Sequence, residues 1–260
     1  MKNMRMIYFC VTMIVAVTLT GCQEMTTQKA EISLQDTETE GVSASAEKYE
    51  ESGKRTAEEL EEMMEEIEEA KLPLSVLLDV ETILQEPELP TGCESVALTM
   101  LLSYEGYDLE KTTIADEYLI YSENWNFDEG YVGDPATPTG AGCFPPTIVK
   151  TADAYLEEQD SSLQAVNLTG KSMEELLHYV AAGHPVAVWT SMYMETPILS
   201  EVLESEFPWY DTEHCVVLAG YDMEAETVSV KDPLLGSVER DLEAFEELYD
   251  LIGQYAVVLL

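Results

Sequence analysis

Positively charged residues are scarce in this chain. Its 260 residues include 12 Lys and Arg against 52 Asp and Glu, which gives a formal net charge of −40 at pH 7. A chain this acidic repels phosphate, so we exclude nucleic acid as a partner. Basic peptides, cations or basic cell-wall components would be attracted, although the same acidity also serves to keep a tethered domain soluble.

Motifs that hold metals or nucleotides are also absent. No Cys-x-x-Cys or His-x-x-x-His spacing indicates zinc, and no segment has the layout of an EF-hand calcium loop. The run Thr169-Gly170-Lys171-Ser172 is similar to the end of a phosphate-binding loop, but the glycine required upstream is replaced by Ala165. We therefore expect neither a metal ion nor another cofactor.

An apolar run long enough for a comfortable membrane span is lacking. Residues Met6 to Val17 are largely apolar and follow Lys2 and Arg5, which is the layout of a secretory signal. Leu19 to Cys22 then resembles the bacterial lipoprotein cleavage box. That resemblance implies that residues 1–21 are removed and that Cys22 carries lipid, which would anchor the protein to the bacterial cell membrane, outside the cytoplasm. An ordinary signal peptide with a chance cysteine is the alternative.

Three segments follow the signal. Residues 22–55 are rich in Thr, Ser, Glu and Ala and cannot bury enough apolar surface to fold, so we expect a disordered tether. Residues 56–72 predict an acidic amphipathic helix, because Thr56 and Glu59 form a capping box and an apolar stripe follows, made of Leu60, Met63, Met64 and Ile67. We expect this stripe to dock on the domain formed by residues 73–260, although pairing with another helix would also cover it.

The stretch from Gln85 to Leu102 predicts a reactive cysteine. Pro87 and Pro90 exclude a helix from its first half, whereas apolar residues recur at three- and four-residue intervals from Cys93 onward. Cys93 therefore begins a buried helix, where free backbone amides and the helix dipole favour thiolate over thiol. The position is typical of a nucleophile.

A nucleophile also needs a base, a group that orients the base, and donors for an oxyanion. His214 begins one strand-like run and Asp232 ends the next, so a hairpin would bring both to the same end. Gln85, just upstream of Cys93, would supply an amide donor. Each residue alone also has a structural explanation, as a buried cap, a strand histidine or an Asp-Pro turn. Their order along the chain is that of papain-like enzymes.

Four phrases are similar to those of stand-alone relatives of bacteriocin-processing, double-glycine cysteine peptidases: Gln85 to Glu94, Gly183 to Val186, Glu213 to Leu218, and Val230 to Gly236. The resemblance implies a papain-like fold with Cys93, His214 and Asp232 as the catalytic triad and Gln85 as the oxyanion donor. It implies no particular substrate. The best-known members are fused to transporter membrane domains and cut leader peptides in the cytosol.

The order of elements supports the same fold class. Helices first and mostly antiparallel strands afterwards favour α+β over a parallel doubly wound sheet. Within this arrangement, residues 112–119 predict a helix, and residues 121–146 predict a long irregular loop. Trp125 and Phe127 in that loop would line a substrate groove or pack the loop down. Trp209, at the end of a second loop, would also line the groove.

The remaining cysteines and histidines are expected to be structural. Cys143 and Cys215 predict buried thiols or, alternatively, a disulfide. Strand alternation directs Cys215 to the face opposite His214, towards packing. His178 falls within a helix and His184 in the turn after it, away from the strand pair that carries the predicted site.

The sequence thus predicts an extracytoplasmic, lipid-anchored cysteine peptidase-like protein that acts on a peptide or protein. Acyl or amide transfer through the same thioester is an alternative, because the acceptor of the acyl group leaves no mark in the sequence. A third hypothesis is a non-catalytic module of the same fold that binds peptides or cell-wall components.

Overall fold

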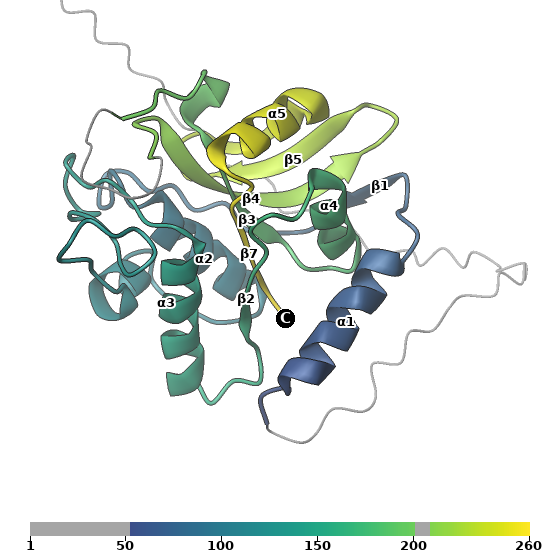
Figure 1. Cartoon of the computed structure of the whole chain (residues 1–260), viewed down its shortest axis with the longest axis horizontal. Helices are drawn as coiled ribbons and strands as arrows, with labels where there is room; N and C mark the ends of the chain where they lie inside the picture. The colour runs from purple at the N-terminus through teal and green to yellow at the C-terminus, as the bar shows by residue number, and fades with distance from the viewer. Residues whose placement is uncertain (1–52, 201–208) are drawn as a thin grey trace, which may run out of the picture. The chain divides into compact units, whose positions relative to one another are not determined.

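A seven-stranded antiparallel sheet organises the part of the chain that the computed structural model describes, residues 53–200 and 209–260 (Figure 1). The strand order is β2-β7-β3-β4-β5-β6, and β1 pairs with β4 beside this path. The strands are β1 (Ser75–Leu77), β2 (Ala165–Asn167), β3 (Val186–Ser191), β4 (Glu213–Asp222), β5 (Thr227–Asp232), β6 (Gly236–Asp241) and β7 (Ala256–Leu259).

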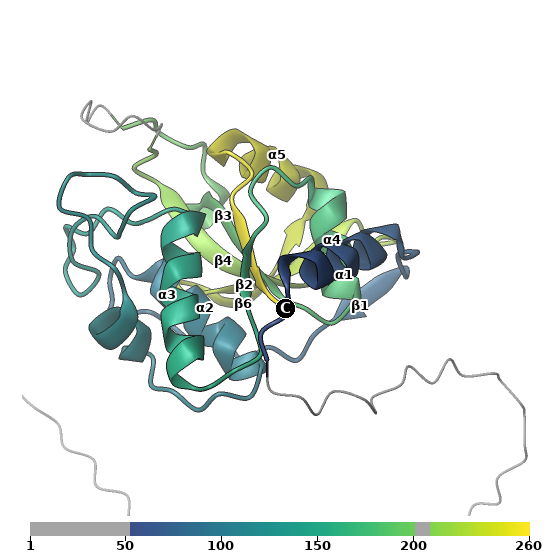
Figure 2. The same ribbon diagram turned by 60° about the horizontal axis from the view of Figure 1, so that its bottom comes forward.

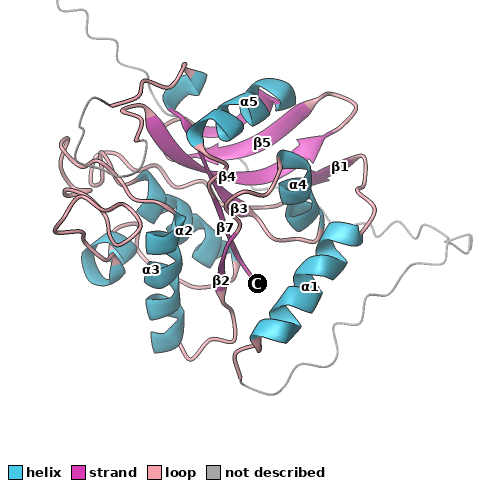
Figure 3. Cartoon of the chain, viewed as in Figure 1, coloured by secondary structure: helices cyan, strands magenta, loops and turns pink. Residues whose placement is uncertain are grey.

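Helices cover both faces of the sheet (Figures 1 and 2). The α-helices are α1 (Ala57–Glu69), α2 (Cys93–Tyr104), α3 (Pro145–Glu158), α4 (Met173–Ala181) and α5 (Leu242–Ile252), and two short helical turns, Ile114–Tyr118 and Met192–Met194, lie between them. Helices α2 and α3 lie on one side of the sheet, and α1, α4 and α5 lie on the other, as the colouring of Figure 3 also shows. The fold is α+β, as the sequence predicts.

The central strand β4 divides the core by simple alternation. Cys215 and Val217 point into the apolar cluster shared with α2 and α3, whereas Val216 and Leu218 point into the cluster shared with α4 and α5. All four side chains are at most 1% exposed. Because both faces of β4 are covered, its sequence reads as a continuous apolar run after His214.

The acidic helix α1 docks on the domain through its apolar stripe. Its expected capping box between Thr56 and Glu59 is present. Ile67 is buried, and the other stripe residues pack against the same cluster as α4. On the polar margin, the Tyr179 hydroxyl donates to Glu68 at 2.6 Å and Lys171 pairs with Glu68 at 2.8 Å. The charged face of α1 remains in solvent.

Two local features differ from what the sequence suggests. The helix expected over residues 112–119 is present but shorter, as a five-residue π-helix, Ile114–Tyr118. Strand β6 was not expected, because its residues Gly236 to Asp241 are polar and alternate between half-buried and exposed positions at the edge of the sheet. β6 is held by backbone hydrogen bonds to β5, and an apolar pattern in the sequence does not predict such bonds.

The predicted signal and Cys22 lie outside the described residues. Within residues 53–200 and 209–260, no helix has the length and apolarity needed to cross a membrane.

We expect Leu98→Ala, in α2, to lower the free energy of unfolding by about 2–5 kcal/mol, because it opens a cavity in the core. The Leu98 side chain is 0% exposed. Leu251→Ala is the matched control, since Leu251 also lies in a helix but is 51% exposed, and it should cost no more than about 0.5 kcal/mol. Urea unfolding of the two variants measures both values; equal losses would contradict the assigned burial of α2.

Candidate active site

Cys93 is the first residue of α2, directly after Gly92 at the N-cap position. It keeps some exposed surface, whereas the helical residues that follow it, 94–102, are buried. The backbone N–H of Cys215 donates to the Cys93 sulfur at 3.4 Å. The start of α2 therefore meets the start of β4, which brings the sulfur within one residue of His214 along the strand.

Burial works against the thiolate that the helix start alone would favour at Cys93. Desolvation by the surrounding protein raises the pKa of Cys93 well above its ordinary value, and the charge of Glu94 raises it further. The thiol donates to Oε2 of Glu94 at 3.2 Å. A helix N-terminus contributes only about 0.3–1 kcal/mol, less than one pKa unit, so burial and a neighbouring carboxylate outweigh it.

His214 and Asp232 form a buried pair at the open end of the β4–β5 hairpin. Nε2 of His214 lies 2.8 Å from Oδ1 of Asp232, and the two residues are 2% and 4% exposed. The hairpin brings them to the same end, as the sequence predicts. An imidazole held this way has its Nε2 engaged, which leaves Nδ1 as the nitrogen able to exchange a proton with another group.

Backbone amides and an arginine hold the Asp232 carboxylate. Oδ1 accepts from the N–H groups of Leu234 at 2.8 Å and Leu235 at 3.3 Å, and Oδ2 lies 3.8 Å from the guanidinium of Arg240. Burial raises the pKa of Asp232, but the hydrogen bonds from His214 and from the two amides outweigh it, so the net shift is downward. The carboxylate is therefore held ionised against the ring.

Gln85 is buried beside this pair and is 2% exposed. Its backbone N–H donates to the carbonyl of Pro233 at 2.9 Å, which ties it to the residue after Asp232. Its side-chain Nε2 donates to the carbonyl of Pro90 at 2.8 Å. An amide nitrogen carries two hydrogens, so one N–H of Gln85 is left for a second acceptor.

Lys111 clamps the turn that carries Gln85. Its Nζ donates to the carbonyls of Leu84 at 3.0 Å, Gln85 at 3.4 Å and Glu86 at 3.1 Å, and it pairs with the carboxylate of Glu88. One ammonium group thus fixes three consecutive carbonyls. Lys111 positions Gln85 from outside the site.

Within the described residues, the His214 ring is not among the hydrogen-bond partners of the Cys93 sulfur, which are the Cys215 amide and the Glu94 carboxyl. The structure therefore brings His214 and Asp232 into direct contact, sets Gln85 beside the Asp232 turn, and joins Cys93 to the same strand end through the neighbouring amide. A change in the side-chain torsion of Cys93 would be needed to turn its proton towards the imidazole.

The three aromatic residues predicted for a groove differ in their surroundings. Phe127 is 0% exposed, so it packs the loop down, the second of the two expected alternatives, and does not line a groove. Its ring centroid lies 5.1 Å from that of Phe144 and 5.6 Å from that of Trp209. Trp209 is half-buried and donates from Nε1 to the carbonyl of Ala141 at 3.2 Å. Trp125 is 41% exposed, which leaves it open to solvent.

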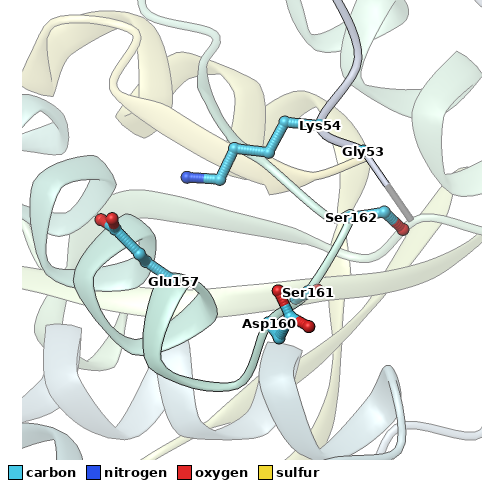
Figure 4. A pocket seen from close by; sticks show the side chains of 6 residues that line it. All are labelled: Gly53, Lys54, Glu157, Asp160, Ser161 and Ser162. Carbon is cyan, nitrogen blue, oxygen red and sulfur yellow. The ribbon is translucent and has the colours of Figure 1, made fainter.

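The other cysteines are free, buried thiols, and Cys215 packs into the core as alternation predicts. In the described part of the chain, no group of three or more His, Cys, Asp or Glu side chains could hold a metal ion. A small surface pocket of about 120 Å³ is lined by Gly53, Lys54, Glu157, Asp160, Ser161 and Ser162 (Figure 4). It contains none of the predicted site residues.

Sequence reasoning missed Glu94, Lys111 and Arg240. Glu94 directly follows the cysteine, so its place in the motif was a usable signal. Lys111 lies 26 residues from Gln85, and no local sequence pattern predicts their contact. Arg240 lies on β6, the strand that was not expected.

Comparisons with known proteins point to one family. The profile of the Peptidase_C39 like family matches residues 77–257. The uncharacterized protein YvpB of Bacillus subtilis (strain 168) is 31% identical over 205 residues, which cover 75% of this chain and 78% of YvpB. A crystal structure of a C39-like peptidase candidate from Bacillus anthracis is 33% identical, with a TM-score of 0.62, and the match covers 72% of this chain and 97% of that one. The fold is shared with that C39-like peptidase candidate.

We expect Asp232→Asn to lower the free energy of unfolding at pH 7 by about 1.5–3 kcal/mol, because it removes a charged hydrogen-bond acceptor. The pKa of Asp232 is lowered on folding, so its charge stabilises the fold above the unfolded-state pKa of about 3.9. This contribution is lost as the pH falls through the lower folded-state value. Urea unfolding at a series of pH values should show that the difference in unfolding free energy between wild type and variant disappears as the pH falls through the folded-state pKa of Asp232.

Asp116→Asn is the control for this series, because Asp116 is exposed. It should change the free energy of unfolding by less than about 0.5 kcal/mol at every pH. A gap between wild type and Asp232→Asn that stays constant down to acid pH would contradict a charged role for Asp232.

Proposed function

Because this chain belongs to the Peptidase_C39 like family, we propose that it is a cysteine peptidase that hydrolyses peptide or protein substrates. Cys93 is the nucleophile, His214 the general base and acid, Asp232 the residue that orients the imidazole, and Gln85 an oxyanion donor. No cofactor takes part in this reaction.

The reaction begins with proton transfer from the Cys93 sulfur to Nδ1 of His214, since Nε2 is engaged by Asp232. The sulfur then attacks the peptide carbonyl, and the carbonyl electrons move to its oxygen. Collapse of this intermediate releases the amine, which takes the proton from His214. Water, deprotonated by His214, hydrolyses the thioester in the same manner and restores the thiol.

Two donors suit the oxyanion. The Cys93 N–H is at the first turn of α2, where backbone amides have no partner within the helix. The free N–H of Gln85 is the second, because its other hydrogen is taken by the Pro90 carbonyl. Lys111 and the Pro233 carbonyl hold the backbone of Gln85, so this donor is fixed in advance.

The buried pair of His214 and Asp232 is the observation that carries the proposal. Both residues are buried, and a buried carboxylate costs stability unless it is paired. At 2.8 Å, with Nδ1 left over, the pair has the geometry of a base and its orienter. The contact between the Cys93 sulfur and the Cys215 amide adds a nucleophile at the same strand end.

We expect iodoacetamide to label Cys93 in the folded protein, and His214→Ala to slow this labelling at pH 7 by about tenfold or more, because the thiolate loses its imidazolium partner. Trypsin separates the described cysteines, since cleavage after Lys71, Lys111, Lys150, Lys171 and Lys231 leaves each one in its own peptide. Mass spectrometry of these peptides measures the rate for Cys93 alone.

The same full-length protein, incubated with a complex peptide mixture, should generate new peptide termini. Cys93→Ala should lower this rate by about 10³-fold or more. Cys143→Ala serves as the control, because Cys143 is fully buried and outside the proposed triad. Labelling that does not depend on His214, without new termini, would favour the binding module over the enzyme.

Anchoring to the outside of the bacterial cell membrane through lipid on Cys22 is a further part of this proposal, supported by the lipoprotein-like box of residues 19–22. We expect Cys22→Ser to move the protein from the membrane fraction to the soluble fraction, because a lipid chain supplies the binding energy. Cys10→Ser, within the apolar run, should leave the distribution unchanged. Cell fractionation with immunoblotting measures both, and a membrane fraction that Cys22→Ser does not alter would rule out this anchor.

A further inference from the structure

The Glu94 carboxyl lies directly against the reacting sulfur. Its Oε2 accepts from the Cys93 thiol at 3.2 Å, and its Oε1 accepts from the backbone N–H of Cys143 at 2.8 Å. The residue is only 3% exposed. A buried carboxyl is costly to retain, so its place beside the nucleophile calls for a chemical reason.

The surrounding backbone is shaped to admit this carboxyl. A Cβ added to Gly142 would lie 2.6 Å from Oε1 of Glu94, and Gly142 has a φ of +118°, which side chains rarely adopt. The next residue, Cys143, donates its N–H to Glu94 and accepts at its carbonyl from Nε1 of Trp189 at 3.0 Å. The carboxyl therefore has little freedom to leave the sulfur.

Most of the titratable groups that face this carboxyl are acids, which become negatively charged when they lose a proton. Burial raises the pKa of Glu94, and its charge in turn raises the pKa values of Cys93 and of its neighbours Tyr131, Cys143, Glu213 and Cys215. His214 acts in the opposite direction and lowers the pKa of Glu94. The charge of Glu94 thus opposes a thiolate at this site.

We propose that Glu94 is a further catalytic residue, whose carboxylate accepts the hydrogen bond of the Cys93 thiol and keeps the sulfur protonated in the substrate-free protein. Thiolate then forms only together with imidazolium: the S–H bond breaks, and the proton passes to Nδ1 of His214. This role rests on the proposed function. It also accounts for the resting geometry, in which the thiol bonds to Glu94 and not to His214.

The arrangement has a chemical advantage. The Glu94 charge raises the free energy of a thiolate without its proton partner, but it lowers the free energy of the imidazolium that accompanies attack. An unpaired thiolate is therefore kept scarce, which slows the reaction of the sulfur with alkylating and oxidising reagents.

Glu94→Gln tests this role with little change in shape. The amide oxygen can still accept from the Cys143 N–H, but the amide nitrogen now donates to the sulfur, which reverses the polarity of that hydrogen bond. We expect the pH midpoint of Cys93 alkylation by iodoacetamide to fall by about one unit or more, and the rate below that midpoint to rise about tenfold. The tryptic peptide of residues 72–111 reports this rate.

Glu213→Gln is the matched control. Glu213 is also a carboxyl near the site with a buried Oε2, but it forms no hydrogen bond with the sulfur. Glu213 is not among the groups that raise the pKa of Cys93, so its substitution should move the Cys93 midpoint by less than about 0.3 unit. An unchanged or higher midpoint in Glu94→Gln, or equal shifts in the two variants, would overturn the proposal.

Separate measurements test whether the variants fold and whether Glu94 has the proposed role. Thermal unfolding shows whether Glu94→Gln is folded, and Glu94→Asp, whose shorter side chain withdraws the carboxylate from the sulfur, should move the midpoint in the same direction by a smaller amount. No shift in either folded variant overturns the role of Glu94. Shifted alkylation without any peptide cleavage by the wild type supports the role of Glu94 and contradicts the peptidase proposal alone.

Discussion

The alignment of β4 with β5 is the constraint on which the rest of the site depends. Val217 pairs with Lys231, and continuing this register places Asp232 opposite Val216, on the face that also carries His214. His214 and Asp232 are then diagonal neighbours, within reach of their side chains. Further along the hairpin, the register shifts between Leu218 and Gly220.

This β-bulge brings His214 onto the same face as Asp232. β5 alternates without interruption, so Asp232 follows Val228 and Val230 on the face of α4 and α5. Without the bulge, the pairing of Gly220 with Ser229 would continue to place Asp232 opposite Val217, and His214 would then point to the opposite face. Gly220 has no side chain at a point where a Cβ would lie 2.6 Å from the carbonyl of Val76 in β1. A close approach of β1 and an irregularity in β4 thus accompany the pairing of base and orienter.

The charges around the sulfur fit the same arrangement. Asp232 is paired with His214 and with backbone amides, so its negative charge is compensated within the fold. Glu94 is buried against a thiol and one amide, so its charge is only partly compensated. One carboxylate therefore stabilises the imidazolium, while the other opposes an isolated thiolate. The two together favour proton transfer between sulfur and imidazole over loss of the proton to solvent.

Local sequence patterns determined much of the architecture. Apolar spacing and caps located α2, α3, α4 and α5, because helix start signals act within a single turn of chain. Strand alternation placed Cys215 in the core, and the hairpin joined His214 to Asp232. Phe127 was ambiguous, since an aromatic residue in a long loop has the same local pattern whether it is buried or exposed.

The sequence by itself determined the element ends at which Cys93, His214 and Asp232 lie, because these depend on propensity and period along a few residues. Only the tertiary structure decided the burial that raises the pKa of Cys93, the hydrogen bonds of Lys111 to the Gln85 turn, and the alignment of His214 with Asp232 on one face of the sheet. These depend on desolvation, on contacts between distant segments and on a single bulge. They arise only when the helix, the turn and the sheet are packed together.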